Sequence, residues 1–73
     1  MTATKLDAKE MGRRLRELRG VFRSQDQVAE ELGVSTASIS LYENGHRIPS
    51  SAAAAKLARY YGVPTDYIFF GKN

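Results

Sequence analysis

Residues 24–45 read SQDQVAEELGVSTASISLYENG, and the fold is decided in this stretch. Ser24 and Ser35 stand at helix N-cap positions, where a serine hydroxyl accepts a hydrogen bond from a backbone N–H of the first turn. Gly33 lies between the two segments, and glycine readily adopts the positive φ at which many helices end. The stretch therefore predicts two short helices joined by a tight turn. They cover residues 25–32 and 36–43.

Three further helices are expected outside this stretch. Each begins after a residue that can cap a helix, and each carries apolar residues at the spacing of an amphipathic helix. One lies between Asp7 and Gly20, one covers residues 51–61 after Ser50, and one covers residues 66–70 after Thr65. The predicted fold class is therefore all-α, a compact five-helix domain.

The expected core follows from the helical wheel. In the first helix, one apolar stripe contains Met11, Leu15, Leu18 and Phe22. Ile48 is expected to anchor the loop that follows the central stretch. The other expected core residues lie in the later helices and turns: Val28, Ala29, Leu32, Val34, Ile39, Tyr42, Ala54, Leu57, Ala58, Tyr61, Val63 and Ile68.

The composition excludes several classes of protein. The chain has 73 residues, enough for one domain over residues 1–73, with residues 1–6 as a flexible leader. It has no cysteine and one histidine, so neither a disulfide nor a structural zinc is expected. There is no run of about 18 apolar residues and no signal peptide, so a cytoplasmic location is expected. No cofactor, metal site or catalytic grouping is predicted, and the protein is not expected to be an enzyme.

Positive charge is concentrated in one part of the chain. Lysine and arginine number 11 against 8 acidic residues, a net charge of +3. Five arginines precede three acidic residues: Arg13, Arg14, Arg16, Arg19 and Arg23, then Asp26, Glu30 and Glu31. Such separation gives a surface one positive side, as nucleic-acid-binding proteins have. A solvated helix face is the other interpretation of the arginines.

The predicted helix of residues 36–43 has a buried side and an outward side. On a wheel of about 100° per residue, Ile39 and Tyr42 mark the buried side. At about 1.5 Å per residue the helix is roughly 12 Å long, which fits the DNA major groove. Four residues of the outward side and its edge could face the bases: Thr36, Ala37, Ser40 and Leu41.

These four side chains are small or apolar, and the face holds no Arg, Lys or Gln, the residues that make bidentate contacts with guanine or adenine. Thr36 and Ala37 fit thymine methyl groups, and Ser40 can form one hydrogen bond. Leu41 either contacts thymine methyls or a partner protein, or packs under a neighbouring loop or helix. We therefore expect modest base discrimination at each half-site, to which dimer formation and DNA shape add the rest.

Polar side chains border this helix at both ends: Gln25, Ser35, Asn44, His46 and Arg47. Gln25 begins the preceding helix, where backbone N–H groups also point outward. Contacts of this kind bind phosphates and set affinity and register rather than sequence. Each residue alone could be a solvated polar group, but their clustering favours a phosphate-binding role.

Four motifs follow one another along residues 9–70: RLRELR, SQDQVAEELGVS, SISLYENGHRIPS and KLARYYGVPTDYI. The ordered set resembles the lambda-repressor/Cro-type (Xre-like) helix-turn-helix family of DNA-binding proteins. The resemblance implies a helix-turn-helix unit over residues 25–43, with the base-facing and phosphate-binding positions named above. It also implies a salt bridge between Arg19 and Glu43. The expected function is sequence-specific binding of double-stranded DNA as a transcriptional repressor.

The last predicted turn holds four large apolar or aromatic residues: Tyr67, Ile68, Phe69 and Phe70. One short helix cannot bury all of them, so Ile68 is assigned to the core and the aromatic residues to an interface. In the family this end commonly forms a two-fold contact, and a homodimer would place two recognition helices ~34 Å apart. A tail folded over the first helix is the alternative. The alternative functions are a protein-interaction module, or the antitoxin of a toxin–antitoxin pair, acting through Leu41 and these aromatic residues.

Overall fold

The computed structural model describes residues 6–72, so most of the expected leader lies outside the described residues. Residues 6–72 form five α-helices and no strand. The helices are α1 (Ala8–Arg19), α2 (Gln25–Leu32), α3 (Thr36–Glu43), α4 (Ser51–Tyr61) and α5 (Thr65–Phe70). The predicted all-α, five-helix fold is confirmed, and α2, α3 and α4 have the expected bounds.

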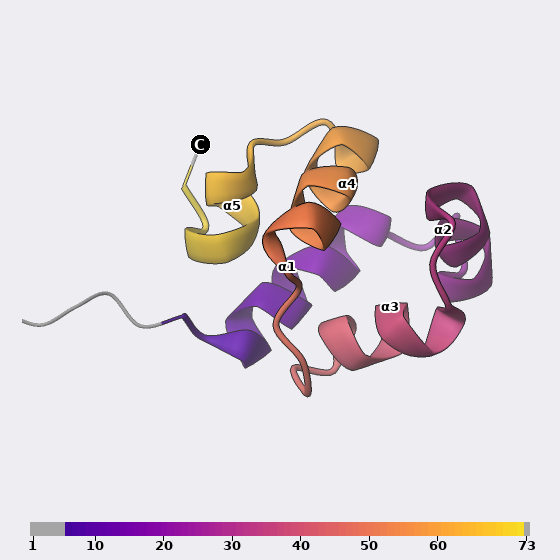
Figure 1. Cartoon of the computed structure of the whole chain (residues 1–73), viewed down its shortest axis with the longest axis horizontal. Coiled ribbons are helices and arrows are strands. Elements are labelled where there is room, and N and C mark those ends of the chain that lie inside the picture. Colours follow the sequence, from indigo (N-terminus) through magenta and orange to yellow (C-terminus); the bar gives the residue numbers. More distant parts are fainter. Residues whose placement is uncertain (1–5, 73) are drawn as a thin grey trace, which may run out of the picture.

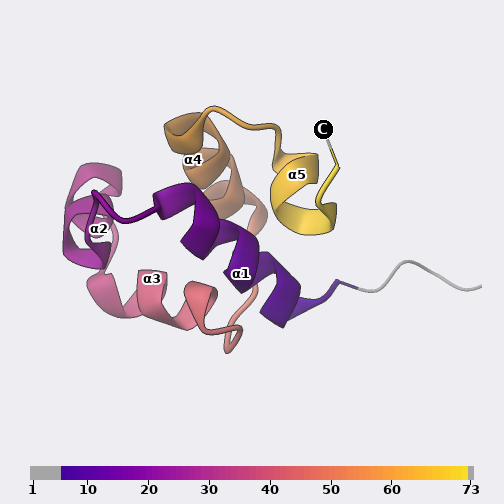
Figure 2. The same ribbon diagram turned by 180° about the vertical axis from the view of Figure 1, so that it is seen from behind.

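Helix α1 crosses the middle of the molecule, behind α4 in Figure 1 and in front of it in Figure 2. α3 and α5 pack against α1, α2 packs against α3, and α4 contacts α2 and α5. In both views α3 lies along an outer edge, and no other helix lies beyond it. One side of α3 is therefore left without a helical neighbour.

The helix ends are fixed by local capping. The Asp7 carboxylate accepts hydrogen bonds from two backbone N–H groups of α1, at 3.1 and 3.2 Å. Serine hydroxyls accept backbone N–H groups at 3.0, 3.0 and 3.1 Å at the starts of α2, α3 and α4. These serines are Ser24, Ser35 and Ser50. Gly33 ends α2 with φ 71°, so the turn into α3 is tight because glycine occupies it.

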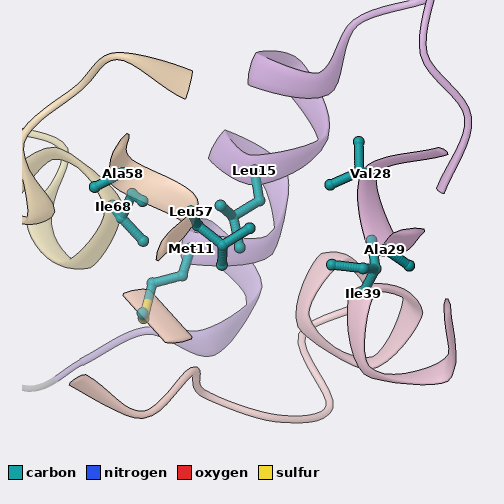
Figure 3. Packing of buried hydrophobic residues seen from close by; sticks show 8 residues of the cluster. All are labelled: Met11, Leu15, Val28, Ala29, Ile39, Leu57, Ala58 and Ile68. Atoms are coloured by element: carbon teal, nitrogen blue, oxygen red, sulfur yellow. The ribbon is translucent and has the colours of Figure 1, made fainter. Parts of the chain in front are cut away.

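All five helices contribute to one core cluster. Its buried members are Met11, Leu15, Val28, Ala29, Ile39, Leu57, Ala58 and Ile68. In Figure 3 these side chains point toward one another from the surrounding helices. Burial of apolar surface is the dominant stabilising contribution in a domain of this kind. Because each helix shares the cluster, the position of α3 depends on the packing of the whole domain.

The turn between α1 and α2 differs from the expectation. Periodicity predicts Phe22 in the buried stripe of α1, and this is wrong, because the residue is 96% exposed. Val21 beside it is 90% exposed. Gly20 ends α1 with φ 69° and ψ −159°, so the helical period no longer applies two residues later.

Two other expectations near loops are wrong. Ile48 is 40% exposed, and the neighbouring Pro49 is buried in its place. Proline has no backbone N–H that would need a partner, which lowers the cost of burying it. Helix α5 begins at Thr65 itself, because Pro64, with φ −72°, occupies the N-cap position that the sequence assigns to Thr65.

Candidate nucleic-acid interface

Helix α3 carries its anchors on one side and small side chains on the other. Ile39 is 2% exposed and belongs to the core cluster, and Tyr42 packs against that cluster. On the opposite side Ala37 is exposed, and Ser40 and Leu41 are half-buried. With eight residues, the outer side is about 12 Å long. This side therefore has the dimensions and the accessibility that insertion into a major groove requires.

The hydroxyl groups of Thr36 and Ser40 in α3 hydrogen-bond to neighbouring side chains. Thr36 Oγ1 donates to Asp26 Oδ1 at 2.7 Å, which ties the start of α3 to α2. Ser40 Oγ accepts from Asn44 Nδ2 at 3.1 Å. Asn44 Oδ1 in turn accepts from Arg16 Nη2 at 2.9 Å, which connects this end of α3 to α1. Both hydroxyls are thus held in position in the DNA-free protein.

The other border residues lie at the two ends of α3. Ser35 is exposed, and its hydroxyl accepts a backbone N–H of the first turn of α3. Gln25 is half-buried and donates one Nε2 hydrogen to Glu43 Oε1 at 3.0 Å, which leaves its second N–H free for a phosphate. His46 and Arg47 are exposed in the loop that follows α3.

The last residue of α3, Glu43, is a buried acid and is only 4% exposed. Arg19 Nε donates to Glu43 Oε2 at 2.8 Å, and Arg19 Nη2 donates to Oε1 at 2.9 Å. The side-chain hydrogen bonds to Glu43 raise the pKa of Arg19 above its ordinary value, while partial burial acts in the opposite direction. With the bond from Gln25, this carboxylate joins α1, α2 and the end of α3.

The carboxylate of Glu43 also affects the pKa of Tyr61, the last residue of α4. Burial raises the pKa of Tyr61 to about 12, and the negative charge of Glu43 adds to the shift. An unfolded tyrosine has a pKa of about 10, so between these two values the folded state holds the proton that the unfolded chain releases. The free energy of unfolding is therefore expected to fall as the pH rises from about 10 to about 12.

Urea unfolding over this pH range, compared with Tyr61→Phe, measures the effect. The phenylalanine variant has no hydroxyl to titrate at this position, so its stability is expected to fall less steeply with pH. Parallel curves for the two proteins would contradict this prediction.

The sequence interpretation missed one residue on which the position of α3 depends. Gly12 is buried in α1, and a Cβ atom there would lie 2.5 Å from the carbonyl oxygen of Glu43 and 2.6 Å from that of Tyr42. The backbones of α1 and α3 therefore touch at this glycine. The sequence carried only a weak signal, because a glycine inside an amphipathic helix costs about 1 kcal/mol relative to alanine but does not indicate which helix it contacts.

The arginine cluster is largely occupied within the protein. Arg14 donates through Nε and Nη2 to the carbonyl oxygen of Ile68 at 3.2 and 2.9 Å, which holds α5 on α1. Arg16 also donates to the backbone carbonyl of Glu43 at 3.2 Å. Arg23 lies over the rings of two tyrosines of α4, 5.2 and 5.3 Å from their centroids. These side chains connect helices, so fewer of them are free to contact a phosphate than their number suggests.

The C-terminal aromatic residues differ in exposure. Phe70 is 43% exposed, whereas Tyr67 and Phe69 are half-buried, and Phe69 packs against the core cluster. The ring centroids of Phe69 and Phe70 lie 6.2 Å apart. Helix α5 therefore presents one largely accessible ring beside a half-buried one.

Residues 6–72 contain neither a candidate metal site nor a membrane-spanning helix. No group of three or more histidine, cysteine or acidic side chains in this part of the chain could hold a metal ion. Its longest helix has 12 residues, whereas about 20 are needed to cross a bilayer. None of the described helices is long and apolar enough for that.

An accessible helix of small side chains, anchored from beneath and joined to the preceding helix by a glycine turn, defines a helix-turn-helix domain. The chain belongs to the helix-turn-helix family, whose model matches residues 13–68. This match confirms the resemblance drawn from the sequence motifs.

Three known proteins illustrate the relationship. An uncharacterized HTH-type transcriptional regulator from Methanocaldococcus jannaschii is 39% identical over 46 residues, which are 63% of this chain and 70% of that protein. The restriction-modification controller protein C.AhdI from Aeromonas hydrophila superimposes with a TM-score of 0.74 at 32% identity, over 86% of this chain and 93% of its own. The P22 c2 repressor, solved with a synthetic operator, gives 0.79 at 27% identity, over 94% and 100%.

The family and these relatives identify the chain as a DNA-binding transcriptional regulator. The family is a class of regulators rather than of enzymes.

Proposed function

We propose that this protein is a cytoplasmic repressor that binds double-stranded DNA as a homodimer and inserts α3 into the major groove. One observation carries the proposal: α3 lies at an outer edge of the molecule with its anchors beneath it. On its outer side Ala37 is exposed, and Thr36, Ser40 and Leu41 are partly accessible. The anchors are Ile39 and Tyr42, and the buried Glu43 fixes the end of the helix, so α3 is held where a groove could receive it.

The base-facing residues in this proposal are Thr36, Ala37, Ser40 and Leu41. Because their side chains are short or apolar, the helix backbone can approach the bases closely. The methyl groups of Thr36 and Ala37 suit thymine methyls, and the hydroxyls of Thr36 and Ser40 suit base edges. Leu41, half-buried at the margin, adds apolar contact.

The phosphate-binding residues in this proposal are Gln25, Ser35, Asn44, His46 and Arg47. They border α3 at both ends, which is where the two strands of DNA pass a helix seated in the groove. Gln25 and Asn44 each retain an amide N–H beyond the hydrogen bond that it already makes. These groups would set affinity and register.

Dimer formation is assigned to α5, through Tyr67, Phe69 and Phe70. The exposed ring of Phe70 supports this assignment, because an accessible aromatic residue beside a half-buried one favours a contact surface. A two-fold axis at this end would make the binding site a palindrome with half-sites ~34 Å apart.

Selection of bound duplexes from a random DNA pool tests the proposal. We expect a palindrome whose half-sites lie about one helical turn apart, and an affinity that falls steeply with salt. If no sequence is enriched even at low salt, the protein is not a sequence-specific DNA-binding protein. If the protein instead binds a protein partner, and this affinity does not change with salt, an interaction module is favoured.

Replacing Arg47 with alanine tests the division between phosphate and base contacts. The variant is expected to bind all sequences more weakly by a similar factor, with a salt slope shallower by about 0.9 for one lost phosphate contact. Affinities measured at several salt concentrations on the selected site and on unrelated DNA give both quantities.

Arg59→Ala is the matched control, because it removes the same charge from an exposed position on α4, away from α3. It should change the salt slope much less. A changed preferred sequence for Arg47→Ala, or an equal effect of the two variants, would overturn this assignment.

A further inference from the structure

We infer that two charged residues outside α3 set which base groups its hydroxyls can recognise. Arg16, acting through Asn44, leaves Ser40 free as a hydrogen-bond donor, and Asp26 leaves Thr36 free as an acceptor. The inference rests on the proposed insertion of α3 into the major groove, and it makes Arg16 and Asp26 positioning residues for sequence recognition.

The direction of the first chain of hydrogen bonds follows from Arg16. A guanidinium can only donate, so the Asn44 atom 2.9 Å from Arg16 Nη2 must be the amide oxygen. The amide nitrogen then faces Ser40 Oγ, 3.1 Å away, and donates to it. One lone pair of Ser40 is thereby occupied, while its own proton is not used in this contact. Ser40 is left to donate that proton to a base.

The direction of the second contact follows from Asp26. A carboxylate at neutral pH only accepts hydrogen bonds, so Thr36 Oγ1, at 2.7 Å from Asp26 Oδ1, must be the donor. The Thr36 proton is therefore consumed inside the protein. Its remaining lone pairs can accept a hydrogen bond from a base, and its methyl group remains available for apolar contact.

The major groove offers distinct partners for these two hydroxyls. The acceptors are the N7 and O6 of guanine, the N7 of adenine and the O4 of thymine, and the donors are the amino groups of adenine and cytosine. Ser40 is expected to favour a base edge that presents an acceptor, and Thr36 one that presents an amino group. The two residues are four apart, about 6 Å along the helix, so they read different base pairs.

The test is the base preference at single positions of the selected site, compared between the wild-type protein and two variants. Asn44→Asp keeps the shape of the side chain but replaces the amide by a carboxylate, which accepts from both Arg16 and Ser40. The Ser40 proton is then consumed, so its preference should shift by about fivefold from acceptor-bearing toward amino-bearing bases. Asp26→Ala frees the Thr36 proton and should relax the Thr36 preference by a similar factor.

Both variants also change the net charge, which shifts the affinity for all sequences and not the ranking of bases. The ranking is therefore the readout, with thermal unfolding to establish that each variant is folded. Ser40→Ala is the matched control: with no hydroxyl at this position, adding Asn44→Asp should leave the base ranking unchanged.

Unchanged rankings in both Asn44→Asp and Asp26→Ala would overturn the inference while leaving the proposed function intact. A wild-type protein that enriches no sequence would overturn both. If Asn44→Asp is unfolded, Asp26→Ala decides alone, and a ranking identical to wild type at each position would overturn the inference.

Discussion

Gly12→Ala is expected to destabilise the fold by about 2 kcal/mol and to weaken DNA binding about tenfold or more. The added Cβ atom would lie 2.5 Å from the carbonyl oxygen of Glu43 and 2.6 Å from that of Tyr42. Both contacts are with backbone atoms, which cannot rotate away as a side chain can. Helix α3 must therefore move away from α1.

The higher helix propensity of alanine opposes this destabilisation, but it is too small to prevent it. Alanine stabilises the interior of a helix by about 1 kcal/mol relative to glycine, whereas overpacking commonly costs 1–3 kcal/mol or more. Because the clash is with the end of α3, the shift would also stretch the hydrogen bonds of Glu43. Recognition should suffer in the folded protein as well as through loss of stability.

Urea unfolding and DNA affinity, measured where the variant is still folded, give the two effects separately. Gly62→Ala is the control, because no atom of a non-neighbouring residue lies within 4 Å of a Cβ atom built there and the cost comes only from its left-handed backbone, with φ 72° and ψ 34°. That cost is about 1–2 kcal/mol, and DNA binding by the folded control should be retained. Equal stabilities of Gly12→Ala and wild type would show that the helices do not touch as described.

The helices were predictable because their ends are encoded locally. Ser24, Ser35 and Ser50 each cap a helix through a contact that spans three residues. Gly33 ends α2 through its own backbone conformation. Such signals need no knowledge of distant parts of the chain, and the apolar period within each helix then indicates its buried side.

The errors and omissions concern contacts that no local pattern encodes. Phe22 follows the period of α1, but the chain has already left the helix at Gly20. Ile48 lies in a loop, where burial depends on the path of the chain and not on periodicity. Gly12 and Arg16 matter because of their distance from the end of α3, and only the packing of α1 against α3 determines that distance.

The sequence predicts which side of α3 faces outward, but it does not predict the hydrogen bonds that the hydroxyls of that side make. The wheel separates Ile39 from Ala37 and Ser40 without any tertiary information, and these residues lie on opposite sides of α3 in the structure. Thr36 is paired with Asp26 of α2, and Asn44, the partner of Ser40, is oriented by Arg16 of α1, so the sequence alone left both donors and acceptors open. One contact between α1 and α3, the pairing of Arg19 with Glu43, was predicted from the family resemblance.

Arg19→Ala is expected to destabilise the protein by about 3–4 kcal/mol, far more than removal of a surface arginine. The variant leaves the Glu43 carboxylate, whose side chain is 2% exposed, with a neutral amide from Gln25 in place of its bidentate cation. Burying an uncompensated charge costs several kcal/mol, whereas an exposed ion pair is worth about 0–1 kcal/mol. The comparison is Arg13→Ala, because Arg13 pairs with two acids on the exposed side of α1.

Urea unfolding of both variants measures the difference, and Arg19→Lys refines it. Lysine keeps the positive charge but cannot present two parallel N–H groups to the carboxylate, so an intermediate stability is expected. Glu43→Gln in the Arg19→Ala background should recover part of the loss, because it removes the buried charge that the first substitution left unpaired. Arg19→Ala no more destabilising than Arg13→Ala would mean that water reaches Glu43. The angle between α1 and α3 would then depend on apolar packing, on the contact at Gly12 and on the hydrogen bonds of Arg16 to Glu43 and Asn44.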